Sequence, residues 1–235
     1  MEPVTALALV CGGIATGAVL IANFRDRVVV RSLVRRLRNP ASRTDALADL
    51  HRRVAMAFAS GDAFRREEAM RYALEPLIVA GLWDEVATLT TKYPGPSSAD
   101  APFWKWLAGV RALAELHRGD AEGAAEALEG VEVDQGWLGA VDALRLAVAG
   151  DGDAALARLE TLKGRIGVAA RYQRDLAEVH ALAATGKRDR AKALLEEHRD
   201  RDDGFLEAVV QLEGPASPIA RAVIAGAAGP FRAAG

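Results

Sequence analysis

Residues 119–128 read GDAEGAAEAL, and this short stretch decides the fold. Gly119 is followed by an acidic residue three positions later (Glu122), a small residue five positions later (Ala124) and a leucine nine positions later (Leu128). Glycine permits the positive φ that ends a helix, and an acidic side chain favours the exposed N-terminus of the next helix. A small residue then lets two antiparallel helices approach closely, and the leucine fills the seam between neighbouring pairs. The stretch therefore predicts a helical hairpin whose joint is Gly119.

The same pattern recurs after Gly81, Gly150 and Gly186, so that the four glycines stand 38, 31 and 36 residues apart. Each is followed by an acidic residue three positions later and a small or β-branched apolar residue five positions later. The ninth position holds leucine in two of these stretches and Thr90 in the first. The matching residues are Asp84 and Val86; Asp153, Ala155 and Leu159; and Asp189, Ala191 and Leu195. A recurring joint predicts a series of helix pairs of similar size.

The rest of the chain favours an all-α body. Alternating β-branched runs are missing, while Ala, Leu, Glu and Arg dominate, and Gly and Pro separate the helical stretches. We expect the body to span residues 41–227 and to be followed by a flexible tail at 228–235. Helices are expected at 43–59, 63–80, 83–92, 101–118, 121–131, 136–149, 153–164, 169–185, 188–200, 203–213 and 217–227.

These joints resemble the tetratricopeptide repeat (TPR) family, whose motif is a pair of antiparallel helices about 34 residues long. The resemblance spans residues 71–199 and rests on the turn glycine, the small residue and the large apolar residue. It implies an α-solenoid that binds other proteins along a concave face formed by the first helix of each pair. The usual closing proline is absent and the repeat lengths are irregular, so a generic helical bundle is the alternative. No Asn follows Asn39, which argues against the carboxylate clamp of one TPR subclass.

The N-terminus predicts a membrane anchor at residues 1–23. Residues 4–23, VTALALVCGGIATGAVLIAN, contain no ionisable group except the thiol of Cys11, the only cysteine. As a helix this stretch would be about 30 Å long, the thickness of the hydrocarbon core of a bilayer. Gly13 and Gly17 form a GxxxG pattern that lets two spanning helices pack closely, including as a homodimer. The alternative is that glycine is simply frequent in spanning helices.

The charges around this stretch predict its orientation. Residues 25–43 hold seven Arg and one Asp, a net charge of +6, whereas residues 44–235 carry −7. Arginines flanking a span stay on the cytoplasmic side, so we expect an outside N-terminus and a cytoplasmic body. A cleaved signal peptide, which would export the body, is the alternative, although Glu2 replaces the basic residues expected before its apolar run. The Arg-rich, Ala-rich composition is typical of a bacterial protein, which places the anchor in the inner membrane.

Residues 24–40 predict a basic amphipathic helix that ends at Asn39-Pro40. One arc of the helix holds Val29, Val30, Leu33, Val34 and Leu37. The opposite arc holds four arginines that are candidates for contact with anionic lipid headgroups: Arg27, Arg31, Arg35 and Arg38. The alternative is that the apolar arc packs on the body.

Two groups of side chains are candidates for binding a partner protein. Residues 101–106, APFWKW, form the densest aromatic cluster, in which Trp104 and Trp106 are two positions apart and cannot both face one core. One of them is therefore a candidate anchor, with packing beneath the preceding loop as the alternative. The second group consists of charged residues expected to be exposed on first helices: Arg111, Glu115, Arg145, Arg171 and Arg174.

Signals for catalysis or for metal and cofactor binding are missing. The four histidines are scattered, no HExxH, phosphate loop or GxSxG elbow occurs, and we expect no cofactor. The acidic body also argues against nucleic-acid binding. We therefore expect a membrane-tethered, non-catalytic helical-repeat scaffold or adaptor that binds a partner protein at the cytoplasmic face of a bacterial inner membrane. An exported periplasmic scaffold and an enzyme with an unrecognised site are the alternatives.

Overall fold

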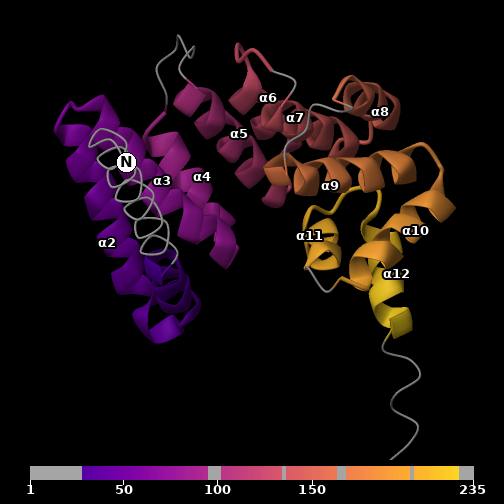
Figure 1. Cartoon of the computed structure of the whole chain (residues 1–235), viewed down its shortest axis with the longest axis horizontal. Coiled ribbons are helices and arrows are strands. Elements are labelled where there is room, and N and C mark those ends of the chain that lie inside the picture. Colours follow the sequence, from indigo (N-terminus) through magenta and orange to yellow (C-terminus); the bar gives the residue numbers. More distant parts are fainter. Residues whose placement is uncertain (1–27, 95–101, 134–135, 163–167, 202–203, 228–235) are drawn as a thin grey trace, which may run out of the picture. The chain divides into compact units, whose positions relative to one another are not determined.

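The computed structural model describes residues 28–94, 102–133, 136–162, 168–201 and 204–227. Helices and their connections account for all of these residues, none of which lies in a strand, so the all-α prediction is confirmed (Figure 1). No helix in these ranges is both long and apolar enough to cross a membrane. The predicted anchor at 1–23 with its Gly13–Gly17 pattern, and the predicted flexible tail at 228–235, lie outside the described residues.

The chain divides into two compact units, Met1–Leu82 and Trp83–Gly235. In the first unit, residues 28–38 are helical and are followed by α2 (Pro40–Ala59) and α3 (Ala63–Ala80). Asn39 is the N-cap of α2: its side chain accepts a hydrogen bond from the N–H of Ala41 at 3.1 Å, and Pro40 occupies the first helical position. The core of this unit includes Leu37, Leu50, Val54, Leu74 and Leu77.

The second unit contains α4 (Trp83–Lys92), α5 (Pro102–His117), α6 (Ala121–Leu128), α7 (Trp137–Val148), α8 (Gly152–Thr161), α9 (Val168–Ala184), α10 (Arg188–Arg199), α11 (Phe205–Gln211) and α12 (Ser217–Ala227). Consecutive helices pack as α5 with α6, α7 with α8, and α9 with α10. The first helices of these pairs also contact one another, α5 with α7 and α7 with α9. One continuous apolar core runs from α5 to α12.

The predicted joints share one backbone geometry. Gly81, Gly119, Gly150 and Gly186 have φ values of 73°, 78°, 89° and 75°. At each joint, the N–H of the glycine donates to the carbonyl three residues earlier, and the following N–H donates to the carbonyl five residues earlier. At Gly119, these bonds reach Leu116 at 3.0 Å and, from Asp120, Glu115 at 2.9 Å. This is the Schellman motif. The predicted positive φ is therefore confirmed at all four joints.

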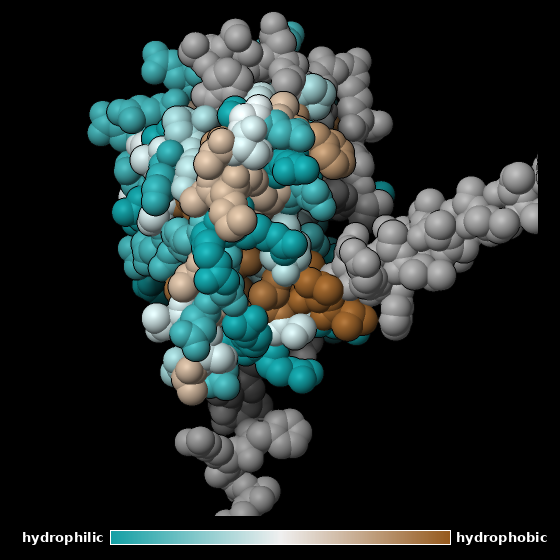
Figure 2. Space-filling model, turned by 90° about the vertical axis from the view of Figure 1, so that its left-hand side faces the viewer, coloured by the Kyte–Doolittle hydropathy of each residue, from teal (hydrophilic) through white to brown (hydrophobic). Residues whose placement is uncertain are grey.

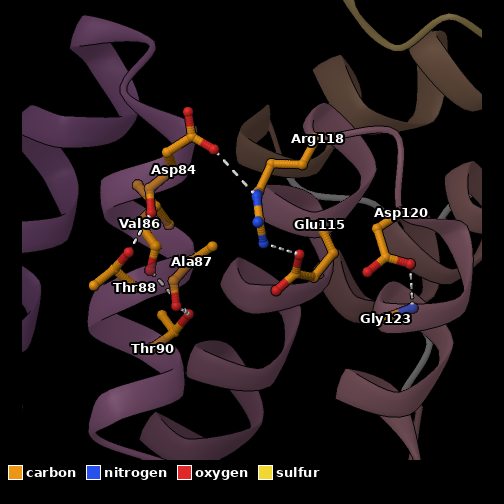
Figure 3. Close-up of polar contacts among 9 residues, drawn as sticks. All are labelled: Asp84, Val86, Ala87, Thr88, Thr90, Glu115, Arg118, Asp120 and Gly123. Atoms are coloured by element: carbon orange, nitrogen blue, oxygen red, sulfur yellow. Dashed lines mark hydrogen bonds and ion pairs between the residues drawn. The ribbon is translucent and has the colours of Figure 1, made fainter.

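The positions after each joint are buried as predicted. Val86, Ala124, Ala155 and Ala191 are fully buried, and Leu128, Leu159 and Leu195 lie in the core. Thr90 occupies the leucine position of the first joint and is also buried. Its hydroxyl donates within α4 to the carbonyl oxygens of Val86 at 2.9 Å and Ala87 at 3.1 Å (Figure 3). Because the hydroxyl is satisfied by its own helix, a polar residue is tolerated in this apolar seam.

At two joints the acidic residue lies at the exposed N-terminus of the next helix, as expected, and a different residue caps that helix. The acidic residues three positions after the glycines, Glu122 and Asp153, are exposed in the first turn and do not cap the helix. The residue directly after each glycine does so instead. The carboxylate of Asp120 accepts the N–H of Gly123 at 2.8 Å (Figure 3), and that of Asp151 accepts the N–H of Ala154 at 3.2 Å.

Close approach between helices of the second unit depends on a buried glycine. A Cβ added at Gly152, the first residue of α8, would lie 2.8 Å from the carbonyl oxygen of Ala181 on α9 and 2.9 Å from the Cβ of Ala184. Both atoms belong to rigid parts of α9. Gly152 therefore sets the distance between α8 and α9, and the GDGDAA sequence around it forms a helix joint.

Candidate functional surfaces

The aromatic cluster at the start of α5 is only half-buried. Phe103 is buried, and its ring centroid lies 4.7 Å from that of Trp104 in an edge-to-face arrangement and 5.8 Å from that of Trp106 in a stacked one. Trp104 and Trp106 are each partly covered. The cluster is therefore partly packed against the protein and partly exposed to solvent. Because neither tryptophan is fully exposed, neither is distinguished as a candidate binding anchor.

Two of the predicted partner-binding arginines, Arg145 and Arg111, are partly buried in the second unit. Arg145 on α7 donates from Nε and Nη2 to Oδ1 of Asp142 at 3.1 and 2.9 Å, and its side chain is 24% exposed. Arg158 on α8 lies 3.5 Å from the other oxygen of Asp142. The Nε of Arg111 on α5 is buried as well. The expectation of exposure is wrong for Arg145, because Asp142, one turn earlier on α7, binds its guanidinium and also pairs with Arg158 of α8.

Glu115 is also buried, contrary to the expectation. Its side chain is 7% exposed and accepts a hydrogen bond from Nη1 of Arg118 at 2.7 Å, while Nε of Arg118 lies 3.1 Å from Oδ1 of Asp84 on α4 (Figure 3). Arg118 thus bridges α4 and α5. The expectation fails because α4, α6 and α7 all pack against α5 and cover a wide arc of it.

The remaining two candidates lie together on α9. Arg171 is exposed, and Arg174 is 45% exposed with its guanidinium 3.4 Å from Glu178. Tyr172, between them, is among the more exposed large hydrophobic residues. Of the charged candidates, these two arginines alone form an exposed pair on one helix.

Buried histidines of the second unit serve the fold. His180 on α9 is fully buried, and its Nδ1 accepts the N–H of Ala216 at 3.3 Å, which holds the turn before α12. Burial lowers the pKa of His180 to about 4. Burial also lowers the pKa of His117 to about 4, and this ring stacks on Trp83 with centroids 4.0 Å apart. Both imidazoles are therefore neutral near pH 7.

The closest approach to a catalytic pair is His198 with Asp175. Nε2 of His198 lies 3.5 Å from Oδ2 of Asp175, and burial raises the pKa of this carboxyl group while Arg174 opposes the rise. However, His198 is 4% exposed and its ring stacks on Phe205 at 3.8 Å. A substrate has no access to an imidazole enclosed in this way. No sequence spacing could reveal the pair, because its members come from different helices.

The basic helix of the first unit packs on the protein. Leu33, Val34 and Leu37 are buried. Nη2 of Arg38 donates to the carbonyl oxygen of Val79 at 2.9 Å, near the end of α3. These observations match the alternative in which the apolar arc packs on the body. The other candidates for lipid contact, Arg31 and Arg35, are exposed, whereas Arg27 lies outside the described residues.

The first unit also has two adjoining hollows, of about 320 and 370 Å³, that the sequence analysis missed. Both are lined by Arg53, Met56 and Tyr72. Ser60, Arg65 and Glu68 complete the first; Leu33, Arg36, Asp49 and Arg52 belong to the second. In Figure 2, hydrophilic side chains cover most of the face that is drawn, and a strongly hydrophobic patch lies among them. No signal in the sequence points to these hollows, because the exposure of Met56 appears only in the folded unit.

Among the described residues, no group of three or more His, Cys, Asp or Glu side chains is placed to hold a metal ion. Comparisons of the chain with protein-family models, with curated proteins and with solved structures found no significant match.

Proposed function

We propose that the protein is a scaffold or adaptor, without catalytic activity, that docks a partner protein at the cytoplasmic face of a bacterial inner membrane. The observation that carries this proposal is the repetition of one joint, because four Schellman turns with the same hydrogen bonds are each followed by the same buried positions. A chain that repeats one hairpin builds an extended surface rather than a single enclosed pocket.

The contacts within the second unit support a TPR-like α-solenoid. The short joints make each pair antiparallel, α5 with α6, α7 with α8, and α9 with α10. First helices contact first helices, as stacked repeats require, and α11 and α12 pack against α10, where a terminal cap belongs. In such an array α5, α7 and α9 form the binding face, on which Arg171 and Arg174 are the exposed charges.

A non-catalytic role agrees with how the titratable groups are used. The imidazole of His180 holds a turn, that of His117 stacks on Trp83, and that of His198 is enclosed by Asp175 and Phe205. An active site needs convergent polar groups that a substrate can reach. These side chains contribute to packing instead.

The membrane tether rests on the sequence, namely the uncharged residues 4–23 and the arginines that follow them. A tether confines the docking surface to a thin layer and raises its effective concentration for a membrane-associated partner. Arg31 and Arg35 remain exposed on the basic helix and are available to anionic headgroups.

Two measurements test the proposal. Alkaline carbonate extraction should leave the full-length chain in the membrane fraction, and crosslinking in native membranes should join the chain to a defined partner protein. Release of the intact chain by carbonate would refute the tether. A chain that crosslinks to no protein in native membranes would refute docking. Digestion of the body by protease added outside spheroplasts would place it in the periplasm instead.

A further inference from the structure

The two hollows of the first unit form one groove along α2. Its α2 side is the row Asp49, Arg53, Met56 and Ser60, the C-cap residue, whose spacing of three or four residues puts them on one helical face, with Arg52 next to Arg53. The eleven helical steps from Asp49 to Ser60 extend about 16 Å. Because Arg53, Met56 and Tyr72 line both hollows, the groove is continuous; we name it the α2 groove.

The floor of the α2 groove is apolar. Met56 is 67% exposed, which is unusual for a large apolar side chain, and Tyr72 of α3 lies beside it. A methionine side chain is flexible and polarisable and adapts to different apolar partners. The floor therefore suits one or two apolar side chains of a ligand.

The rim of the α2 groove is basic. Asp49 lies between Arg36 at 3.5 Å and Arg52 at 2.6 Å, so its charge is already compensated. Arg53 forms no ion pair within the described part of the chain; its guanidinium lies 4.1 Å from the centroid of the Tyr72 ring. This stacking holds the guanidinium over the floor. Among the described residues, Arg65 pairs only with the exposed Asp62, at 3.6 Å, which is a weak interaction in water.

We propose that the α2 groove binds an acidic segment of a partner protein, with an apolar side chain on Met56 and Tyr72 and carboxylates on Arg53 and Arg65. The inference rests on the proposed docking function. It adds the α2 groove of the first unit to the face formed by α5, α7 and α9, and it names the chemistry of the segment that the groove binds. The positive charge of the rim and of the whole unit, +4 over Met1–Leu82, is complementary to carboxylates. A groove of this length holds about three turns of helix.

A protein segment fits the α2 groove better than a bilayer surface does. A bilayer presents a broad, flat layer of phosphates, whereas the arginines here surround a hollow with an apolar floor. Glu68 also lines the groove, and it would repel a continuous anionic surface while a peptide can place a polar or basic residue beside it.

The test uses the full chain in nanodiscs of phosphatidylcholine and a phage library of random twelve-residue peptides. Selection should enrich peptides with several Glu or Asp residues around a Leu, Phe or Trp. The enriched peptide, labelled with fluorescein, should bind at least about tenfold more weakly to Arg53→Glu and to Met56→Glu, in the range of a central contact or a charge reversal. Higher salt should weaken wild-type binding further.

The matched control is Arg190→Glu, the same charge reversal at an exposed position on α10 in the second unit. It should leave the peptide affinity unchanged. Arg53 and Met56 are both exposed, so circular dichroism should show wild-type helicity in their variants. Failure to enrich any peptide, enrichment of peptides that are not acidic, or equal affinity for wild type and Arg53→Glu would overturn the proposal.

Two further outcomes separate the alternatives. If vesicles containing phosphatidylglycerol bind the wild type and lose binding with Arg53→Glu while no peptide is enriched, a lipid surface occupies the groove and the proposal fails. If Arg53→Glu still crosslinks to the wild-type partner in native membranes, the α2 groove is not the docking site although the scaffold function stands. If the wild type itself crosslinks to nothing, the scaffold function fails as well.

Discussion

The two units of the chain use charge in different ways. Met1–Leu82 has twelve Arg and eight acidic residues, a net charge of +4, whereas Trp83–Gly235 has 18 basic and 24 acidic residues, a net charge of −6. In the second unit, Arg118 and Arg158 form ion pairs that tie helices together. In the first unit, Arg53 and Arg65 surround an exposed apolar floor. These arginines of the second unit thus stabilise packing, whereas Arg53 and Arg65 of the first unit are left available.

The comparison predicts separate unfolding of the two units. All four tryptophans, at positions 83, 104, 106 and 137, belong to the second unit, so their fluorescence reports that unit alone. Leu144 is fully buried there. Leu144→Ala should lower the free energy of unfolding followed by fluorescence by about 2–5 kcal/mol, because it leaves a cavity. Denaturant titration of the full chain in detergent measures this.

Leu37→Ala is the matched change in the first unit, where Leu37 is also fully buried. It should lower the stability of the first unit, measured from the unfolding transition in circular dichroism. The unfolding transition followed by tryptophan fluorescence should be unchanged. A parallel shift of both signals would mean that the units unfold as one body.

The second unit should lose stability in acid because of its buried histidines. Burial lowers the pKa of His180 from its ordinary value of 6.5 to about 4, so the unfolded chain binds a proton that the folded chain excludes. The contribution is complete above pH 6.5 and is lost as the pH falls toward 4, by at most about 3 kcal/mol at 1.36 kcal/mol per pH unit. Fluorescence-detected unfolding between pH 4 and 7 measures the loss.

His180→Asn is the control for this pH dependence. The Oδ1 of asparagine lies where Nδ1 of the histidine does and can still accept the N–H of Ala216, but asparagine does not titrate. The slope between pH 4 and 6.5 should become shallower, with the part due to His117 remaining. An unchanged slope would contradict the assignment to His180.

Close helix packing in the second unit should make Gly152 sensitive to one methyl group. Gly152→Ala should cost about 1–3 kcal/mol, because the added Cβ meets the backbone of α9 at 2.8 Å. Gly226→Ala on α12 is the matched control, since a Cβ there meets nothing within 4 Å. It should be neutral or slightly stabilising. Thermal unfolding of both variants compares them, and equal destabilisation would exclude crowding at α8 as the cause.

The smallest expected effect tests whether the joints are equivalent. Replacing Gly119, Gly150 or Gly186 singly by Ala should cost about 1–2 kcal/mol each, because each has a positive φ and no neighbour within 4 Å of an added Cβ. Similar losses in unfolding free energy at all three positions are expected. A joint that tolerates alanine without loss would not share the Schellman geometry.

Helix bounds in this chain could be predicted from sequence because glycine ends the helices by a local mechanism. The expected segments 63–80, 83–92 and 217–227 match α3, α4 and α12 at both ends. The expected helix bounds are wrong where a local feature other than glycine begins or ends the helix. The helix expected at 121–131 ends at Leu128, because Glu129 is extended, and α2 begins at Pro40 because Asn39 caps it.

Exposure was much harder to predict than helicity, since it depends on neighbours that are distant in sequence. Glu115 and Arg145 occupy positions that periodicity leaves open. Glu115 is nevertheless buried under the helices packed on α5, and Asp142, which binds Arg145, also pairs with Arg158 of α8. The α2 groove was missed for the same reason. Its lining comes from residues 28–38, α2 and α3, so no single stretch of sequence shows Met56 and Tyr72 side by side.

The four glycine turns are held entirely by main-chain atoms, through the N–H of the glycine and that of the next residue. Such a turn is indifferent to which side chains flank it and to how long the adjoining helices are. An insertion or deletion of a helical turn between two joints therefore lengthens or shortens a helix without breaking a connection. The unequal intervals of 38, 31 and 36 residues between the joints agree with this tolerance.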